Sequence, residues 1–178
     1  MRLNRLFMGL AGFALLLTNA CAGYNVVKQA TPNPFVGKKA FAVAPIDFGD
    51  HTTGDDVKAE INKSFKEELA DELGSDFQLV EPGANPEAFT VALKVYNLKE
   101  GQPMNLQMNP AVLGVDVMIM QGDQVLDQIK VEKIMNRPPA SIGGIPMGGF
   151  TVSQRLGGLA DDVAEDVGGY IEDRVAGP

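Results

Sequence analysis

The chain has a single histidine, His51, which lies in an acidic stretch with Asp47, Asp50, Asp55 and Asp56. Imidazole and carboxylate groups are ligands of divalent cations, and Asp50, His51 and Asp55 are the weak candidates for a metal site. The acids lack the spacing of a twelve-residue calcium loop. Acids at the start of a helix also stabilise its N-terminus without a metal. We favour a solvated loop, with metal binding as the alternative.

Other chemistry has few candidate residues. Nucleophilic catalysis needs a base beside the nucleophile, and the chain offers one histidine, a few serines and no nucleophile-elbow pattern. Thioethers bind Cu(I), but Met118, Met120 and the other methionines are better explained by packing. A net charge of −8 leaves no electrostatic footprint for nucleic acid. We expect no enzyme, no cofactor and no nucleic-acid partner.

The only cysteine, Cys21, follows a segment with the composition of a signal peptide. Arg2 and Arg5 precede an uncharged, mostly apolar run over residues 6–17. This run is shorter than the roughly 20 residues that cross a bilayer, but it suits the apolar region of a signal peptide. An unpaired cysteine in an exported protein needs an explanation, and covalent attachment of lipid supplies one.

Residues 17–21, Leu-Thr-Asn-Ala-Cys, resemble the lipobox of bacterial lipoproteins. That family usually has leucine where this chain has Thr18. The resemblance implies a signal peptide over residues 1–20 and acylation of Cys21, for example with palmitate. Ala22 is not the aspartate of inner-membrane retention, which implies the periplasmic face of the outer membrane. The alternative is ordinary secretory cleavage at Ala20-Cys21-Ala22, which would leave a soluble protein.

The remaining chain divides into a tether and one domain. Residues 21–38 contain Pro32 and Pro34 and show little periodicity, which predicts a flexible tether that reaches about 20–25 Å. Residues 39–178 suit a single domain.

Apolar periodicity predicts a strand, a helix, four strands and a second helix. The first helix carries an apolar residue at every fourth position. Its expected range is 55–73, the second helix spans 151–174, and the strands span 40–46, 77–81, 89–98, 112–120 and 125–135. Residues 136–149 are rich in glycine and proline and are predicted to be a loop.

This order favours an α+β fold, an α/β two-layer sandwich. We expect a five-stranded mixed sheet, mainly antiparallel, with both helices on one face. The pattern resembles uncharacterised Gram-negative lipoproteins of a domain-of-unknown-function family. That resemblance brings no activity with it.

The last two predicted strands form a hairpin, and the apolar pattern selects its register. A two-residue loop would leave neither face consistently apolar. A three-residue loop over residues 122–124 places Val117 opposite Ile129 and Asp116 opposite Lys130. We therefore predict the longer loop, against the general preference for two-residue hairpins.

Two glycine pairs interrupt the second helix: Gly157-Gly158 and Gly168-Gly169. Each glycine costs about 1 kcal/mol relative to alanine. Either a partner approaches a bare strip of backbone or the helix is broken or kinked near Gly157, and we favour the broken or kinked helix. The residues of the possible partner surface are Gly158, Gly169, Pro146 and Met147.

Two functions remain open. We expect an outer-membrane-anchored lipoprotein with a non-enzymatic periplasmic domain that binds another envelope protein or supports envelope assembly. The alternative is a periplasmic ligand or metal carrier that uses residues 47–56 or a cleft beside residues 136–149. We do not expect a small-molecule ligand.

Overall fold

The computed structural model describes residues 23–101, 103–104, 107–135, 141–142, 145–146 and 151–177. The main elements are β1 (Tyr24–Lys28), β2 (Ala40–Val43), α1 (Asp55–Leu73), β3 (Gln78–Val80), β4 (Phe89–Lys99), β7 (Ala111–Gln121), β8 (Gln124–Met135) and α2 (Val152–Ala176). Two short ladders complete them: β5 (Pro103–Met104) with β6 (Gln107–Met108), and β9 (Ser141–Ile142) with β10 (Ile145–Pro146). Cys21 and Met147 lie outside the described residues.

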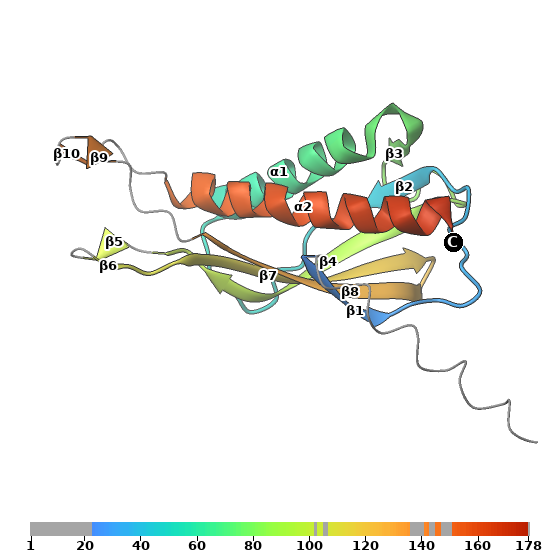
Figure 1. The fold of residues 1–178 in the computed structure, drawn as a ribbon, viewed down its shortest axis with the longest axis horizontal. Coiled ribbons are helices and arrows are strands. Elements are labelled where there is room, and N and C mark those ends of the chain that lie inside the picture. The colour runs from blue at the N-terminus through green and yellow to red at the C-terminus, as the bar shows by residue number, and fades with distance from the viewer. Residues whose placement is uncertain are drawn as a thin grey trace, which may run out of the picture.

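The main sheet is open and mixed, with the strand order β1-β8-β7-β4-β2-β3. β2 runs parallel to β3 and β4, and the other pairings are antiparallel. Both helices lie on one side of this sheet (Figure 1). The α+β fold, the mixed sheet and the two helices are as predicted, but the sheet has six strands and not five.

The sixth strand, β1, lies inside the segment that we interpreted as a tether. β1 pairs antiparallel with β8, so that Tyr24 faces Val131. Further along, Phe35 is only 1% exposed and packs its ring on Phe89 at a centroid distance of 4.6 Å. The prediction of a free tether over residues 21–38 is therefore wrong for residues 24–37. The segment is held by distant partners, which its own short and proline-broken pattern does not reveal.

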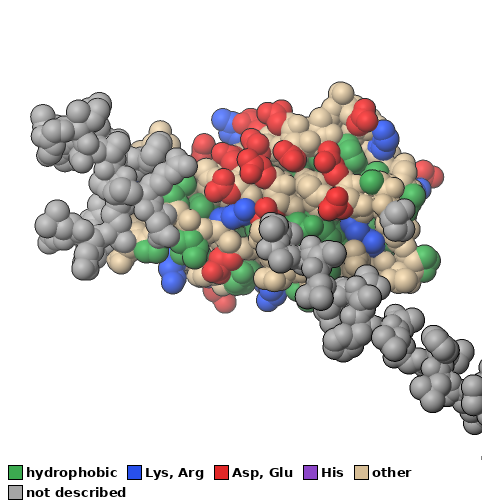
Figure 2. All heavy atoms as spheres, in the orientation of Figure 1, with side chains coloured by type: hydrophobic (Ala, Val, Ile, Leu, Met, Phe, Trp, Pro, Cys, Tyr) green, Lys and Arg blue, Asp and Glu red, His purple; other side chains and the backbone are tan. Residues whose placement is uncertain are grey.

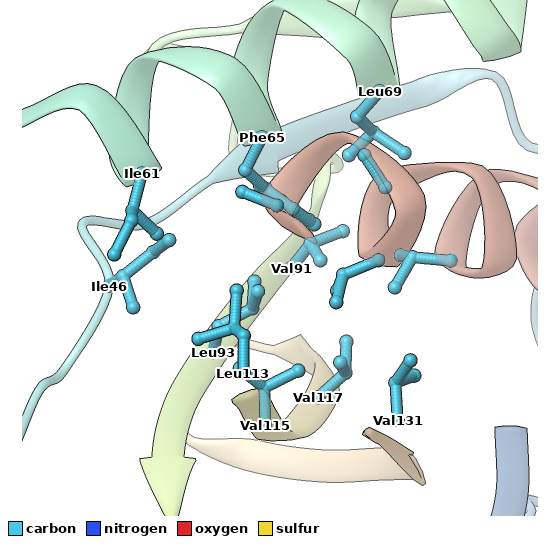
Figure 3. Close-up of a cluster of buried hydrophobic side chains, with 14 of the residues drawn as sticks. Ile46, Ile61, Phe65, Leu69, Val91, Leu93, Leu113, Val115, Val117 and Val131 are labelled. Atoms are coloured by element: carbon cyan, nitrogen blue, oxygen red, sulfur yellow. The ribbon is translucent and has the colours of Figure 1, made fainter. Parts of the chain in front are cut away.

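The core lies between the helices and the sheet (Figure 3). As predicted, α1 buries the apolar residues that recur at every fourth position: Val57, Ile61, Phe65, Leu69 and Leu73. The sheet contributes the inward residues of its long strands, among them Val91, Leu93, Val115, Val117 and Val131. Each such side chain stabilises the fold by about 1.5–3 kcal/mol through removal of apolar surface from water.

The register of β7 against β8 is as predicted in the middle of the strands. Val117 faces Ile129, and both side chains are buried beneath the helices. On the other face Asp116 lies opposite Lys130, and their charged groups are 3.6 Å apart.

The hairpin turn is shorter than predicted. Gln121 pairs with Gln124, so the turn holds only Gly122 and Asp123. Gly122 has φ 57°, the left-handed conformation that tight hairpin turns require. The conflict with the apolar pattern is resolved by a β-bulge at Leu126, which adds one residue to β8. The chain thus combines the two-residue turn with the register that the longer loop predicted.

α2 is one continuous helix, so the predicted break near Gly157 is wrong. Gly157 and Gly168 instead face α1. An added Cβ would lie 3.1 Å from Ser64 Oγ at Gly157 and 2.4 Å from Glu72 Cγ at Gly168. The bare strip of backbone therefore serves close packing between the two helices of this chain, which offsets the low helix propensity of glycine.

The two glycines of the second pair should respond differently to alanine. Gly168→Ala should lower the free energy of unfolding, because overpacking costs about 1–3 kcal/mol against about 1 kcal/mol of helix propensity. Gly169 has no atom within 4 Å of an added Cβ, so Gly169→Ala should raise the free energy of unfolding by roughly 0.4–1 kcal/mol. Denaturant titration of both variants checks this. Stabilisation by Gly168→Ala would contradict the close approach of α1.

Candidate functional site

The acidic loop around His51 is bonded to itself and to its neighbours. His51 N donates to the Phe48 carbonyl, and Gly49 N donates to Asp47 Oδ1 at 2.8 Å. Asp55 lies 4.0 Å from Lys58 within the first turns of α1. Among the described residues no three His, Cys, Asp or Glu side chains are grouped as a metal site. The structure therefore does not bring Asp50, His51 and Asp55 together as ligands.

A buried carboxylate that the sequence analysis missed, Asp127 of β8, is the most constrained charge of the described residues. Its side chain is 0% exposed. Oδ2 accepts hydrogen bonds from the Tyr170 hydroxyl at 2.6 Å and from Arg174 Nε at 2.7 Å, and Oδ1 accepts from Ala30 N at 2.7 Å. Asp127 shares the helix side of the sheet with Ile129 by the regular alternation of β8, and it lies opposite Ile119. In the sequence it looks like an ordinary polar position beside a turn.

Arg174 extends this contact to the segment before β2. Its Nη2 donates to the Ala30 carbonyl at 3.0 Å, and its own carbonyl accepts from Asn33 Nδ2 at 2.7 Å. Its guanidinium lies 5.4 Å from the centre of the Phe35 ring. We call Asp127, Tyr170, Arg174 and the segment 30–35 the clasp. It joins the sheet, the last turns of α2 and the N-terminal segment.

The clasp is suited to structure and not to proton transfer. Burial, followed by the hydrogen bond to Asp127, raises the pKa of Tyr170 well above its ordinary value of 10.0. The hydroxyl therefore stays protonated and donates to the carboxylate. Both oxygens of Asp127 already accept from donors within the chain, which leaves no poised general base here.

A surface depression of about 380 Å³ lies beside the starts of β2 and β3. Lys39 and Asp76 line it and pair at 3.5 Å, with side chains 55% and 82% exposed. Small-molecule sites are mostly apolar and enclose their ligand. This depression is polar and open, and it does not include the loop around His51.

The outward surface of the helix layer is strongly acidic (Figure 2). The carboxylates that influence one another there are Glu60, Glu68, Asp71, Glu72, Asp161, Asp162 and Glu165. Burial raises the pKa of Asp161, a hydrogen bond with Ser64 partly opposes this, and neighbouring acids raise it further. Burial and then the nearby Asp161 likewise raise the pKa of Glu68.

The face of the sheet that points away from the helices carries both apolar and charged side chains. Tyr96 of β4 is 39% exposed and Ile134 of β8 is 52% exposed. The Tyr96 ring lies over Gly114, where an added Cβ would be 2.8 Å from the ring, and Lys130 Nζ is 5.1 Å from the ring centre. Burial, then Glu132 and Asp116, raise the pKa of Tyr96. Met118 and Met120 lie half-buried on the same face. We call this surface the open sheet face.

The structure describes only some of the residues that the sequence predicted as a partner surface. Gly158 and Gly169 lie on the flank of α2 that does not face α1, where an added Cβ at Gly158 would touch Met135 Cε at 3.4 Å. Pro146 belongs to β10, and Met147 and Cys21 lie outside the described residues. No helix of the described residues is long and apolar enough to cross a membrane.

Compared with known protein families and with curated proteins, the sequence matches none. Similar folds occur among solved structures. The hypothetical protein CT253 from Chlamydia trachomatis has a TM-score of 0.49 and 16% identity over 75% of this chain and 98% of that one. The PelC dodecamer from Paraburkholderia phytofirmans has a TM-score of 0.48 and 12% identity, with coverage of 81% and 94%. Protein XCC0632 from Xanthomonas campestris, of the DUF330 family, has a TM-score of 0.43 and 9% identity, with coverage of 82% and 90%.

These similarities concern the arrangement of elements alone. They include a hypothetical protein and a member of a family of unknown function. They assign no activity, and the lipobox remains a prediction from the sequence.

The clasp predicts that neutralising Asp127 strongly destabilises the fold. Asp127→Asn should lower the free energy of unfolding by about 3–5 kcal/mol, because Arg174 is left as a buried charge without its counterion. Asp116→Asn is the matched control, since its pair with Lys130 lies on the open sheet face and should matter by less than about 1 kcal/mol. Denaturant titration gives the energies. Equal losses for the two variants would contradict the special role of Asp127.

Proposed function

We propose that this chain is an outer-membrane-anchored lipoprotein whose periplasmic domain is not an enzyme and binds another envelope protein or supports envelope assembly. Removal of residues 1–20 makes Cys21 the first residue, and its acyl chains hold the protein in the membrane. At about 0.8 kcal/mol per buried methylene, more than one acyl chain suffices for stable anchoring.

The open sheet face is the observation that carries the binding part of this proposal. Because both helices cover the other side, the long strands β4, β7 and β8 present this face outward (Figure 1). Along each strand of a sheet, the side chains that point to a solvated face are normally polar. Here Tyr96, Ile134, Met118 and Met120 lie among the charged residues, and aromatic residues and methionine are enriched in protein interfaces.

The state of the ionisable groups supports a non-enzymatic domain. Catalytic sites combine perturbed pKa values with a cleft and a group free to accept a proton. Asp127 and Tyr170 are the deeply buried titratable pair of the described residues, and Arg174 and Ala30 complete their hydrogen bonding. The depression beside β2 contains neither of them.

Acylation is tested at its predicted site. Cys21→Ser should move the protein from the outer-membrane fraction to the soluble periplasmic fraction, because no other segment is expected to hold it in the membrane. Fractionation of cells that express each form, with labelled palmitate, measures this. Unchanged membrane association of the variant, or absence of label in the wild type, would contradict acylation of Cys21.

The open sheet face is tested by photo-crosslinking in living cells. A benzoylphenylalanine at position 96 or 134 should form adducts of discrete mass with an envelope protein. The control is position 63 on α1, where Lys63 is 62% exposed and points away from the sheet. Adducts from position 63 alone, or from none of the three, would contradict a partner on this face.

A further inference from the structure

The described chain is fixed to the domain from its first residue. Gly23 lies against Asp166 of α2, where an added Cβ would be 2.3 Å from Oδ2. Asp166 pairs with Lys133 of β8 at 2.8 Å, and both side chains are mostly buried. The entry of the chain therefore lies where α2 and β8 are already joined by an ion pair.

The residues that follow Gly23 are held at several independent points. The Tyr24 ring packs edge-on against Tyr170 at 5.3 Å. β1 then pairs with β8, and the clasp holds residues 30–35. Ring packing, ladder hydrogen bonds and a buried ion pair would all have to break before this segment could act as a flexible spacer.

This docking leaves almost no length between the domain and the predicted anchor. Only Ala22 separates Gly23 from Cys21. An extended chain spans at most about 3.6 Å per residue, so the acylated cysteine lies within about 7 Å of Gly23. A free tether over residues 21–38 would have reached about 20–25 Å.

We propose that the surface around Gly23 and β1 rests on the lipid bilayer that carries the acyl chains of Cys21. The inference rests on the anchor proposed above, and it adds which surface of the domain faces the membrane. A bilayer can occupy this surface because the covalent connection holds it there. The domain is thereby oriented as well as attached.

The side chains of the segment suit a bilayer surface. Five large apolar residues are notably exposed in the described part of the chain, and two of them lie in β1: Val26 at 36% and Val27 at 52%. Val27 is the extra residue of a bulge in β1, and Lys28 follows it. Apolar side chains beside a lysine suit the boundary between headgroups and acyl chains.

The strand order determines how far each edge of the sheet lies from the bilayer. β1 is one edge of the sheet and β3 is the other, five strand spacings away. At about 4.8 Å per spacing, β3 stands about 24 Å further from the bilayer than β1. A sheet that rests on its β1 edge leaves the open sheet face clear of the membrane for a protein partner.

Fluorescence quenching from labelled lipids tests this orientation. The acylated protein is placed in vesicles of phosphatidylethanolamine and phosphatidylcholine that carry a headgroup quencher. These lipids are chosen because the chain is acidic and an anionic surface would repel it. Val27→Cys and Gln78→Cys each provide one thiol for a fluorophore, since acylation blocks Cys21. Gln78 is exposed and lies in β3, at the opposite edge of the sheet.

We expect the probe at position 27 to lose most of its fluorescence and the probe at position 78 to lose little. Insertion of twelve Gly and Ser residues between Ala22 and Gly23 adds about 20 Å of flexible reach and should remove this difference. A thermal unfolding curve for each labelled protein verifies that the fold is kept.

Two failures can be told apart. Equal quenching at positions 27 and 78 in the vesicle-bound protein would overturn the proposed orientation and leave the anchor intact. An intact mass that begins at Gly23, with no vesicle binding, would show cleavage after Ala22. That result would overturn the anchor and the orientation together.

Discussion

The burial of one carboxylate, Asp127, is the constraint on which much of the structure depends. Removing a charge from water costs several kcal/mol unless a counterion and hydrogen bonds replace the lost hydration. Here the replacements come from three places far apart in the sequence: Arg174, Tyr170 and the backbone of Ala30. Satisfying this one group therefore requires that β8, the end of α2 and the segment before β2 be in place together. The regular alternation of β8 from Val131 through Ile129 directs the carboxylate inward, and the bulge at Leu126 joins this register to the two-residue turn.

The close contact of the two helices is a second constraint, and it determines what the sheet can offer. α1 and α2 share one face of the sheet, and Gly157 and Gly168 let side chains of α1 pack directly on the backbone of α2. The outward surface of this layer is acidic, whereas the opposite sheet face combines apolar side chains with paired charges. The two surfaces differ enough in chemistry that a partner of one would not suit the other. This division underlies our proposal that the open sheet face binds a protein.

The clasp and the membrane proposal are linked by the same segment. Because residues 24–37 are docked, whatever holds Cys21 also orients the domain, and orientation decides which surfaces a partner can reach. A flexible tether would allow every surface to be presented in turn. In our proposal the docked segment selects one presentation, with the β1 edge toward the lipid and with the open sheet face and the acidic surface of the helix layer both accessible.

The sequence by itself determined the parts of the fold that depend on local periodicity. The α1 stripe, the long strands and the pairing of Val117 with Ile129 follow from apolar side chains that recur with the period of their element. Only the tertiary structure decided the rest. β1 is a strand because β8 has a free edge beside it, and α2 stays whole across its glycines because α1 fills the space. Asp127 can be buried as a charge because distant donors meet it on the helix side of the sheet. Each of these features depends on contacts between residues that are distant in the chain. A local sequence pattern does not reveal such contacts.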